Sequence, residues 1–99
     1  MAELPPLSVH EVLAGDWVLR LDGTVLELFH AGTEIVRRRH VRFLAVEGKD
    51  REGGLALTVG MEVSGQVIGD RVFVPAAQRD DVMALFAEAR RRRDMLLSA

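Results

Sequence analysis

Apolar and polar side chains alternate through most of the chain before residue 75. Apolar side chains recur at every second position of residues 17–21 and of residues 26–28, as in strands that bury one face. Asp22-Gly23, which lies between the two runs, is a dipeptide typical of tight hairpin turns. The sequence therefore predicts two antiparallel strands joined by a hairpin.

Further short runs with the same period follow, separated by turn residues, so that six or seven strands are expected in all. In chain order they predict a turn at Ala31-Gly32, strands over 34–36 and 41–47, a charged glycine-rich loop over 48–54, and strands over 55–59, 61–68 and 69–74, with a bulge or turn at Gly65. The arginine run is expected to form the connection between the strands over 34–36 and 41–47.

The hydrophobic period then changes from two to that of an α-helix. The predicted helix opens after Pro75, with Asp80 and Asp81 near its positive N-terminal end and Arg90–Arg93 near its negative C-terminal end. One helical stripe carries the apolar residues Val82, Leu85, Phe86, Ala89 and Leu96. This stripe predicts a helix of about five turns that covers the strands.

At the other end of the chain, capping signals favour a short helix. Ser8 stands as a possible N-cap, Glu11 follows it at capping-box spacing, and Gly15 is a typical C-terminal stop after the Pro5-Pro6 pair. Residues 1–14 are accordingly predicted to be an N-terminal segment containing a short helix.

The expected fold class is mainly β with one C-terminal helix, an α+β arrangement. The phrases "DWVLRLDGTVLELFHAGTE" and "DRVFVPAAQRDDVMALFAEARR" resemble the opening hairpin and closing helix of small bacterial pleckstrin-homology-like (PH-like) domains, over about Gly15–Arg92. The resemblance implies one domain over 15–99, a bent barrel or sandwich of about seven antiparallel strands capped by the helix. It also implies a non-enzymatic binding or assembly module for lipid head groups, peptides or partner proteins.

Two positions depart from the phosphoinositide-binding members of that group. Their first two strands carry several basic residues, whereas this chain offers Arg20 on the first strand and Glu27 on the second. Glu27 would repel an inositol phosphate, so a protein partner or self-association is expected instead.

Composition narrows the chemistry further. The chain has no cysteine, and its three histidines, His10, His30 and His40, lack metal-ligand spacing, so no metal or other cofactor is expected. Its net charge of −2 argues against a general nucleic-acid binder. No signal peptide or membrane span is visible, which favours a cytoplasmic protein.

The candidate binding residues are Arg37, Arg38, Arg39, His40 and Arg42, because four arginines within six positions offer forked donors to a phosphate or carboxylate. In an extended chain Arg37 and Arg39 point one way and Arg38 the other, so only a subset could meet one ligand. The alternative is a solvated charged turn that prevents edge-to-edge pairing of strands.

The same run supports a second resemblance. "RRRHVR" together with "DREGGLAL" from Asp50 is similar to the PilZ family, which implies a cyclic di-GMP sensor that binds an anionic small ligand through arginines. Glu52 replaces the family's serine, and only seven residues separate Arg42 from Asp50.

A third hypothesis is a homo-oligomer joined through sheet edges, which would cover apolar residues on the outer faces of the strands, namely Val18, Val25, Phe29 and Phe73.

The arginines of 90–93 are not expected to form one flat patch, because consecutive helical residues differ by about 100° in direction. No catalytic constellation is present, so an enzyme is not expected.

Overall fold

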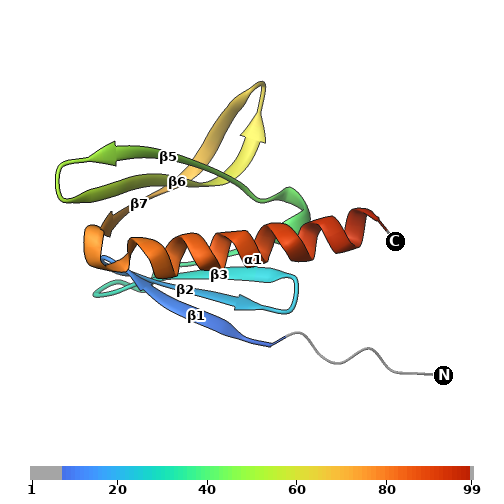
Figure 1. The fold of residues 1–99 in the computed structure, drawn as a ribbon, viewed down its shortest axis with the longest axis horizontal. Coiled ribbons are helices and arrows are strands. Elements are labelled where there is room, and N and C mark those ends of the chain that lie inside the picture. Colours follow the sequence, from blue (N-terminus) through green and yellow to red (C-terminus); the bar gives the residue numbers. More distant parts are fainter. Residues whose placement is uncertain (1–7, 99) are drawn as a thin grey trace.

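The computed structural model of the chain describes residues 8–98 as seven strands and one long helix (Figure 1). The strands are β1 (His10–Ala14), β2 (Trp17–Asp22), β3 (Val25–His30), β4 (Val36–His40), β5 (Ala45–Arg51), β6 (Gly54–Val63) and β7 (Gln66–Pro75), the helix is α1 (Arg79–Leu97), and the 3-10 turns are η1 (Val41–Phe43) and η2 (Ala76–Gln78). The predicted class, seven antiparallel strands with a C-terminal helix, is confirmed. No helix in this range has both the length and the apolar composition needed to cross a membrane.

The strands form two antiparallel sheets, with order β1-β2-β3-β4 in the first and β5-β6-β7 in the second. The hairpin predicted at Asp22-Gly23 is confirmed, with Leu19 opposite Leu28 and Leu21 opposite Leu26. These four leucines are fully buried, because their shared face is the one that packs into the core.

The core lies between the two sheets and α1. It is formed by the alternating apolar residues of the strands and by the apolar stripe of the helix. Its buried apolar residues are Ala14, Trp17, Leu19, Leu21, Leu26, Leu28, Val41, Leu55, Leu57, Val59, Val72, Val74, Val82, Leu85, Phe86 and Ala89. Burial of apolar area on this scale is the dominant favourable contribution to folding.

The short helix predicted near the N-terminus is wrong, because residues 10–14 form strand β1. β1 pairs with β2 from His10 opposite Leu21 to Ala14 opposite Trp17, and this backbone ladder outweighs the local capping signals. Gly15, with φ +59°, is a turn residue between two strands and not the stop of a helix. The start of the predicted segment, including Pro5-Pro6, lies outside the described residues.

The connection predicted at the arginine run is also wrong, because that run is itself strand β4. The chain then turns through η1, where the expected strand over 41–47 should have begun, and β5 continues to Arg51. The loop expected over 48–54 is therefore only a tight turn at Glu52-Gly53. A strand of charged residues is tolerated here because β4 is a sheet edge and its arginines have carboxylate partners on other strands.

The helical stripe is confirmed for its first four residues, but Leu96 is 42% exposed. Figure 1 shows the last turns of α1 extending past the ends of the strands, so no sheet remains there to cover Leu96. Arg92 takes the buried position on the stripe instead, with 2% of its surface exposed.

β6 and β7 form the longest hairpin, and its outer half projects from the body of the molecule (Figure 1). Gly60 and Gly69 lie opposite each other in this hairpin. A Cβ added at Gly60 would lie 1.9 Å from the carbonyl oxygen of Ile68, so only glycine permits this approach of the two backbones.

Candidate functional site

The candidate arginines of β4 divide between the two faces of the sheet, as the strand period predicts. Arg37 and Arg39 both approach Asp70 of β7, with Nε–Oδ1 and Nη2–Oδ2 distances of 3.3 and 3.6 Å, respectively. Arg38 lies on the other face and donates from Nε to Glu27 at 3.0 Å. These pairs link β4 to β3 and to β7 of the other sheet, and the carboxylates largely neutralise the charges of the three arginines.

His40 and Arg42 have separate positions. The Nδ1 atom of His40 accepts a hydrogen bond of 3.1 Å from the backbone N–H of Arg42 and thereby caps η1. The Arg42 guanidinium lies 5.9 Å from the centre of the Phe43 ring. The five predicted side chains therefore do not meet at one point, and Arg42 alone among them reaches the surface described next.

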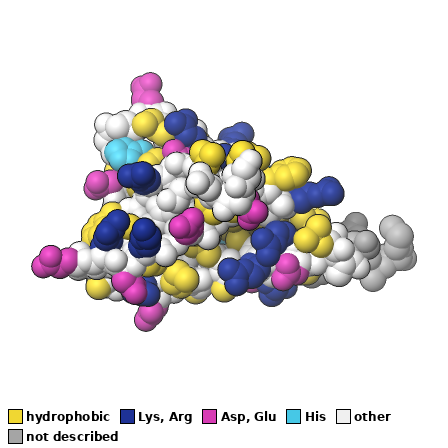
Figure 2. All heavy atoms as spheres, turned by 90° about the horizontal axis from the view of Figure 1, so that it is seen from above, with side chains coloured by type: hydrophobic (Ala, Val, Ile, Leu, Met, Phe, Trp, Pro, Cys, Tyr) yellow, Lys and Arg dark blue, Asp and Glu magenta, His cyan; other side chains and the backbone are white. Residues whose placement is uncertain are grey.

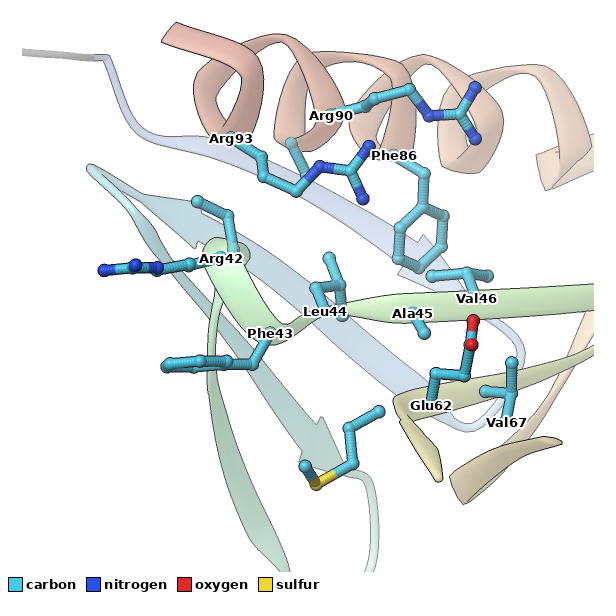
Figure 3. Close-up of a pocket in the computed structure, with 13 residues that line it drawn as sticks. Arg42, Phe43, Leu44, Ala45, Val46, Glu62, Val67, Phe86, Arg90 and Arg93 are labelled. Carbon is cyan, nitrogen blue, oxygen red and sulfur yellow. The ribbon is translucent and has the colours of Figure 1, made fainter. Parts of the chain in front are cut away.

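An open groove of about 680 Å³ runs between α1, the η1–β5 segment and the outer half of the β6–β7 hairpin (Figure 3). Its lining residues are Val41, Arg42, Phe43, Leu44, Ala45, Val46, Met61, Glu62, Val67, Phe86, Ala89, Arg90 and Arg93. We call this surface the α1–β5 groove.

The floor of the α1–β5 groove is apolar. Leu44 and Val46 pack against the core from the strand side, and Phe86 and Ala89 do so from the helix. Figure 3 shows the ring of Phe86 pointing from α1 toward Val46. An apolar floor beside polar walls is typical of a ligand or peptide site.

Basic residues dominate the charged part of the groove. Arg42, Arg90 and Arg93 line it, against the single carboxylate of Glu62. Within residues 8–98 Arg42 and Arg90 form no ion pair, and Arg93 has only the 3.6 Å approach of its Nε to Asp94. Figure 3 shows Arg93 reaching toward Phe86, Arg90 lying along α1, and Arg42 pointing outward at one end.

The helical arginines do not form one flat patch, as expected from their spacing. Arg91 pairs with Glu88 on the exposed side, and Arg92 is buried on the strand side. Arg90 and Arg93, three residues apart, lie on the same side of α1 as Phe86. Sequence reasoning missed this pair, although their spacing from Phe86 and Ala89 was a usable signal.

Glu88 is the carboxylate that pairs with two of the helical arginines, Arg91 and Arg92. Its hydrogen bond from Arg91 is the main reason that the pKa of Glu88 is lowered from 4.5 to about 2, with Arg92 adding to the effect and burial opposing it. Arg92 Nε donates to Glu88 Oε1 at 2.9 Å. Glu88 therefore stabilises the folded chain as an anion.

Acid should remove that contribution of Glu88. Because its folded pKa of about 2 is below 4.5, the stabilisation is present above pH 4.5 and is lost as the pH falls toward 2. We expect Glu88→Gln to be less stable than the wild type at neutral pH by an amount on the order of 1 kcal/mol, since the pair is partly solvated.

Urea unfolding at a series of pH values measures this effect. The difference between the two proteins should shrink toward zero between pH 4.5 and 2. Glu52→Gln, in the exposed turn between β5 and β6, is the control and should show no such convergence. A gap between wild type and Glu88→Gln that is constant with pH would contradict the prediction.

Other titratable groups have structural roles or no special setting. His30 stacks edge-on against Trp17 at 4.8 Å and its Nδ1 lies 3.1 Å from Thr33 Oγ1. Among the described residues no three of the His, Asp and Glu side chains are placed to hold a metal ion.

Comparison of the chain with protein-family models, with curated proteins and with solved structures found no match.

Proposed function

We propose that this chain is a non-enzymatic, PH-like binding module that holds a segment of a protein partner in the α1–β5 groove. The arrangement of four strands, three strands and a closing helix supports the proposal, because it is the layout that the resemblance implies. The groove lies where the helix meets the edge of the second sheet, so the segment would contact two rigid elements.

The observation that carries the proposal is the contrast between two sets of arginines. Arg37, Arg38 and Arg39 have carboxylate partners on β3 or on β7 of the other sheet, whereas Arg42 and Arg90 have none in the described part of the chain. Guanidinium groups beside an apolar floor would gain charge-assisted hydrogen bonds from an acidic partner that also inserts an apolar side chain. An acidic, amphipathic segment is therefore the partner that fits.

Selection from a random peptide library against the purified chain tests this proposal. We expect the selected peptides to combine Asp or Glu with large apolar residues. The double replacement Arg90→Glu and Arg93→Glu should weaken the binding of a selected peptide, measured by fluorescence polarisation, by about tenfold or more, because two attractive contacts become repulsive.

Arg71→Glu provides the matched control. Arg71 is an exposed arginine of β7 outside the groove, and its replacement makes the same charge change as either groove replacement. Equal binding to the wild type and the double variant would contradict the proposal. A doubled apparent mass in light scattering, with no peptide selected, would replace it by self-association.

Exposed apolar side chains also favour self-association, but they are mostly not the residues predicted from the sequence. Val18, Val25 and Phe29 are half-buried, so of the apolar residues expected on the outer faces only Phe73 is exposed. The projecting hairpin instead exposes other apolar side chains, namely Met61, Val63 and Ile68. This surface adjoins the α1–β5 groove and extends the area that a partner would cover.

The nucleotide sensor implied by the PilZ resemblance has weaker geometric support. Arg38 and Arg39 lie on opposite faces of β4, and Arg42 follows in η1 beside Phe43. A ligand bound by all three would require β4 to rearrange, so the α1–β5 groove is the better candidate.

A further inference from the structure

The second sheet has a hollow of about 380 Å³ that shares no lining residue with the α1–β5 groove. It is lined by Glu47, Lys49, Arg51, Ala56, Leu57, Thr58, Arg71, Val72 and Phe73. Leu57 and Val72 are buried on the core side of the sheet, whereas Ala56 and Phe73 lie opposite each other and face outward. The hollow therefore lies on the outer face of the sheet, and we call it the outer-face hollow.

An aromatic ring lies at one side of the outer-face hollow. Phe73 is 47% exposed, and a Cβ added at Gly54 would lie 3.1 Å from its Cζ atom. The ring therefore leans across the sheet over Gly54, where there is no side chain to lift it. Ala56 beside it carries only a methyl group, so the space next to the ring stays open.

Three cations line the outer-face hollow together with this ring. Lys49 and Arg51 come from β5, and Arg71 lies two residues before Phe73 on the same face of β7. None of the three forms an ion pair within residues 8–98, and Glu47 is the carboxylate that lines the hollow with them. The local charge is thus positive although the whole chain carries −2.

We propose that the outer-face hollow binds a free mononucleotide, with the base stacked on Phe73 and the phosphate held by Arg71, Lys49 and Arg51. Base stacking on an aromatic side chain combined with basic residues is the usual recognition of nucleotide units on sheets. The hydroxyl of Thr58, which also lines the hollow, is available to the sugar or the phosphate.

Size and charge both favour a single nucleotide over a strand of nucleic acid. The volume lies within the range of about 300–1,000 Å³ that small-ligand sites occupy. One exposed ring offers one stacking position, and at physiological salt the three cations act over only about 8 Å. The net charge of −2 would oppose a longer polyanion.

Titration of the ¹⁵N-labelled chain with adenosine 5′-monophosphate, adenosine and inorganic phosphate tests the proposal by NMR. We expect the monophosphate to shift backbone signals of residues 47–51, 56–58 and 71–73, and to bind about tenfold or more tightly than either fragment. Arg71→Ala and Phe73→Leu should each weaken its binding by about fivefold or more.

The variants are chosen so that loss of folding is not mistaken for loss of binding. Phe73→Leu keeps an apolar cover over Gly54 but removes the flat ring, and Arg71→Ala alters only an exposed side chain. Phe43→Leu is the matched control, because Phe43 is an exposed phenylalanine of the α1–β5 groove. It should leave nucleotide binding unchanged.

Several results would overturn the proposal. If phosphate alone bound as tightly as the monophosphate, the base would not be stacking on the Phe73 ring. Unchanged binding of the monophosphate by Phe73→Leu would lead to the same conclusion. Absence of any shift with about 10 mM monophosphate would exclude the site, since this exceeds ordinary metabolite affinities. A six-nucleotide single strand binding more than about tenfold tighter would make nucleic acid, and not a free nucleotide, the ligand.

Discussion

Replacement of Phe86 by alanine is expected to lower the free energy of unfolding by about 3–5 kcal/mol. Phe86 is 8% exposed and is the largest apolar side chain that α1 contributes to the core. Its ring fills the space between the helix and the start of β5, where the floor of the α1–β5 groove would otherwise open inward (Figure 3). Alanine would lose the transfer energy of the ring and leave a cavity that the two rigid elements cannot close.

Urea unfolding followed by circular dichroism measures the loss, and the dependence on urea should stay unchanged if the native fold is kept. Met83→Ala on the same helix is the control, because Met83 is 47% exposed and its truncation should change stability by less than about 1 kcal/mol. A cost below about 1 kcal/mol for Phe86→Ala would show that α1 does not pack at this position.

Replacement of Arg92 by methionine is the second change with a large expected effect, a loss of about 3–5 kcal/mol. The guanidinium is buried and donates three hydrogen bonds, from Nε to Glu88 at 2.9 Å, from Nη1 to the Gly23 carbonyl at 2.9 Å and from Nη2 to the Ser8 carbonyl at 2.7 Å. Methionine keeps much of the volume but removes the donor to the Gly23 and Ser8 carbonyls, while Glu88 keeps only its pair with Arg91.

Arg91→Met tests whether the effect comes from burial. Arg91 pairs with the same Glu88 but is exposed, so its loss should cost far less stability than the loss of Arg92. Arg92→Lys should recover only part of the stability, because an ammonium group cannot reproduce the planar fork that meets three acceptors. Equal effects of Arg91→Met and Arg92→Met would contradict this account.

The position of Arg92 also explains how α1 is oriented. Its partners lie before β1 and in the β2–β3 turn, which adjoin each other because His10 pairs with Leu21, so one side chain joins the helix to one end of the first sheet. That orientation turns Phe86 inward and places Arg90 and Arg93 beside the η1–β5 segment (Figure 3). The groove thus depends on a buried residue that does not line it.

The two proposed binding regions are separate from each other on the surface of the molecule. Figure 2 shows Lys and Arg side chains in several clusters, with exposed hydrophobic side chains between them, on the face seen from above. Because the α1–β5 groove and the outer-face hollow share no lining residue, the double Arg90→Glu, Arg93→Glu variant should leave nucleotide binding unchanged, as Arg71→Glu should leave peptide binding unchanged. Failure at one region would leave the evidence for the other unchanged.

The alternation of apolar residues was sufficient to predict the β2–β3 hairpin, and the helical stripe was sufficient to predict α1. In both cases the buried side chains repeat with the period of the element, so local spacing and core contacts agree. The prediction failed where the local sequence signals and the tertiary contacts favoured different structures. The capping signals at Ser8 and Glu11 favoured a helix, but pairing with β2 satisfied the backbone of residues 10–14 as a strand.

Charge was harder to interpret from sequence than hydrophobicity. The sequence does not show whether an arginine is solvated, paired or buried. Its role depends on carboxylates and carbonyls that distant segments of the chain bring next to it in the fold. Arg37 meets Asp70 from another sheet, and Arg92 meets carbonyls near the opposite end of the chain. No local pattern encodes these pairings.

Periodic burial, which is a property of neighbouring residues, was thus enough to establish a mainly β fold, a closing helix and most of the core, but it did not find β1 or β4. The choice of which arginines remain without partners, and their convergence with Phe86 on one groove, required the packing of α1 against both sheets. The physical reason is range: a strand or helical face is defined over a few residues, whereas ion pairs and grooves form between segments that are adjacent only after folding.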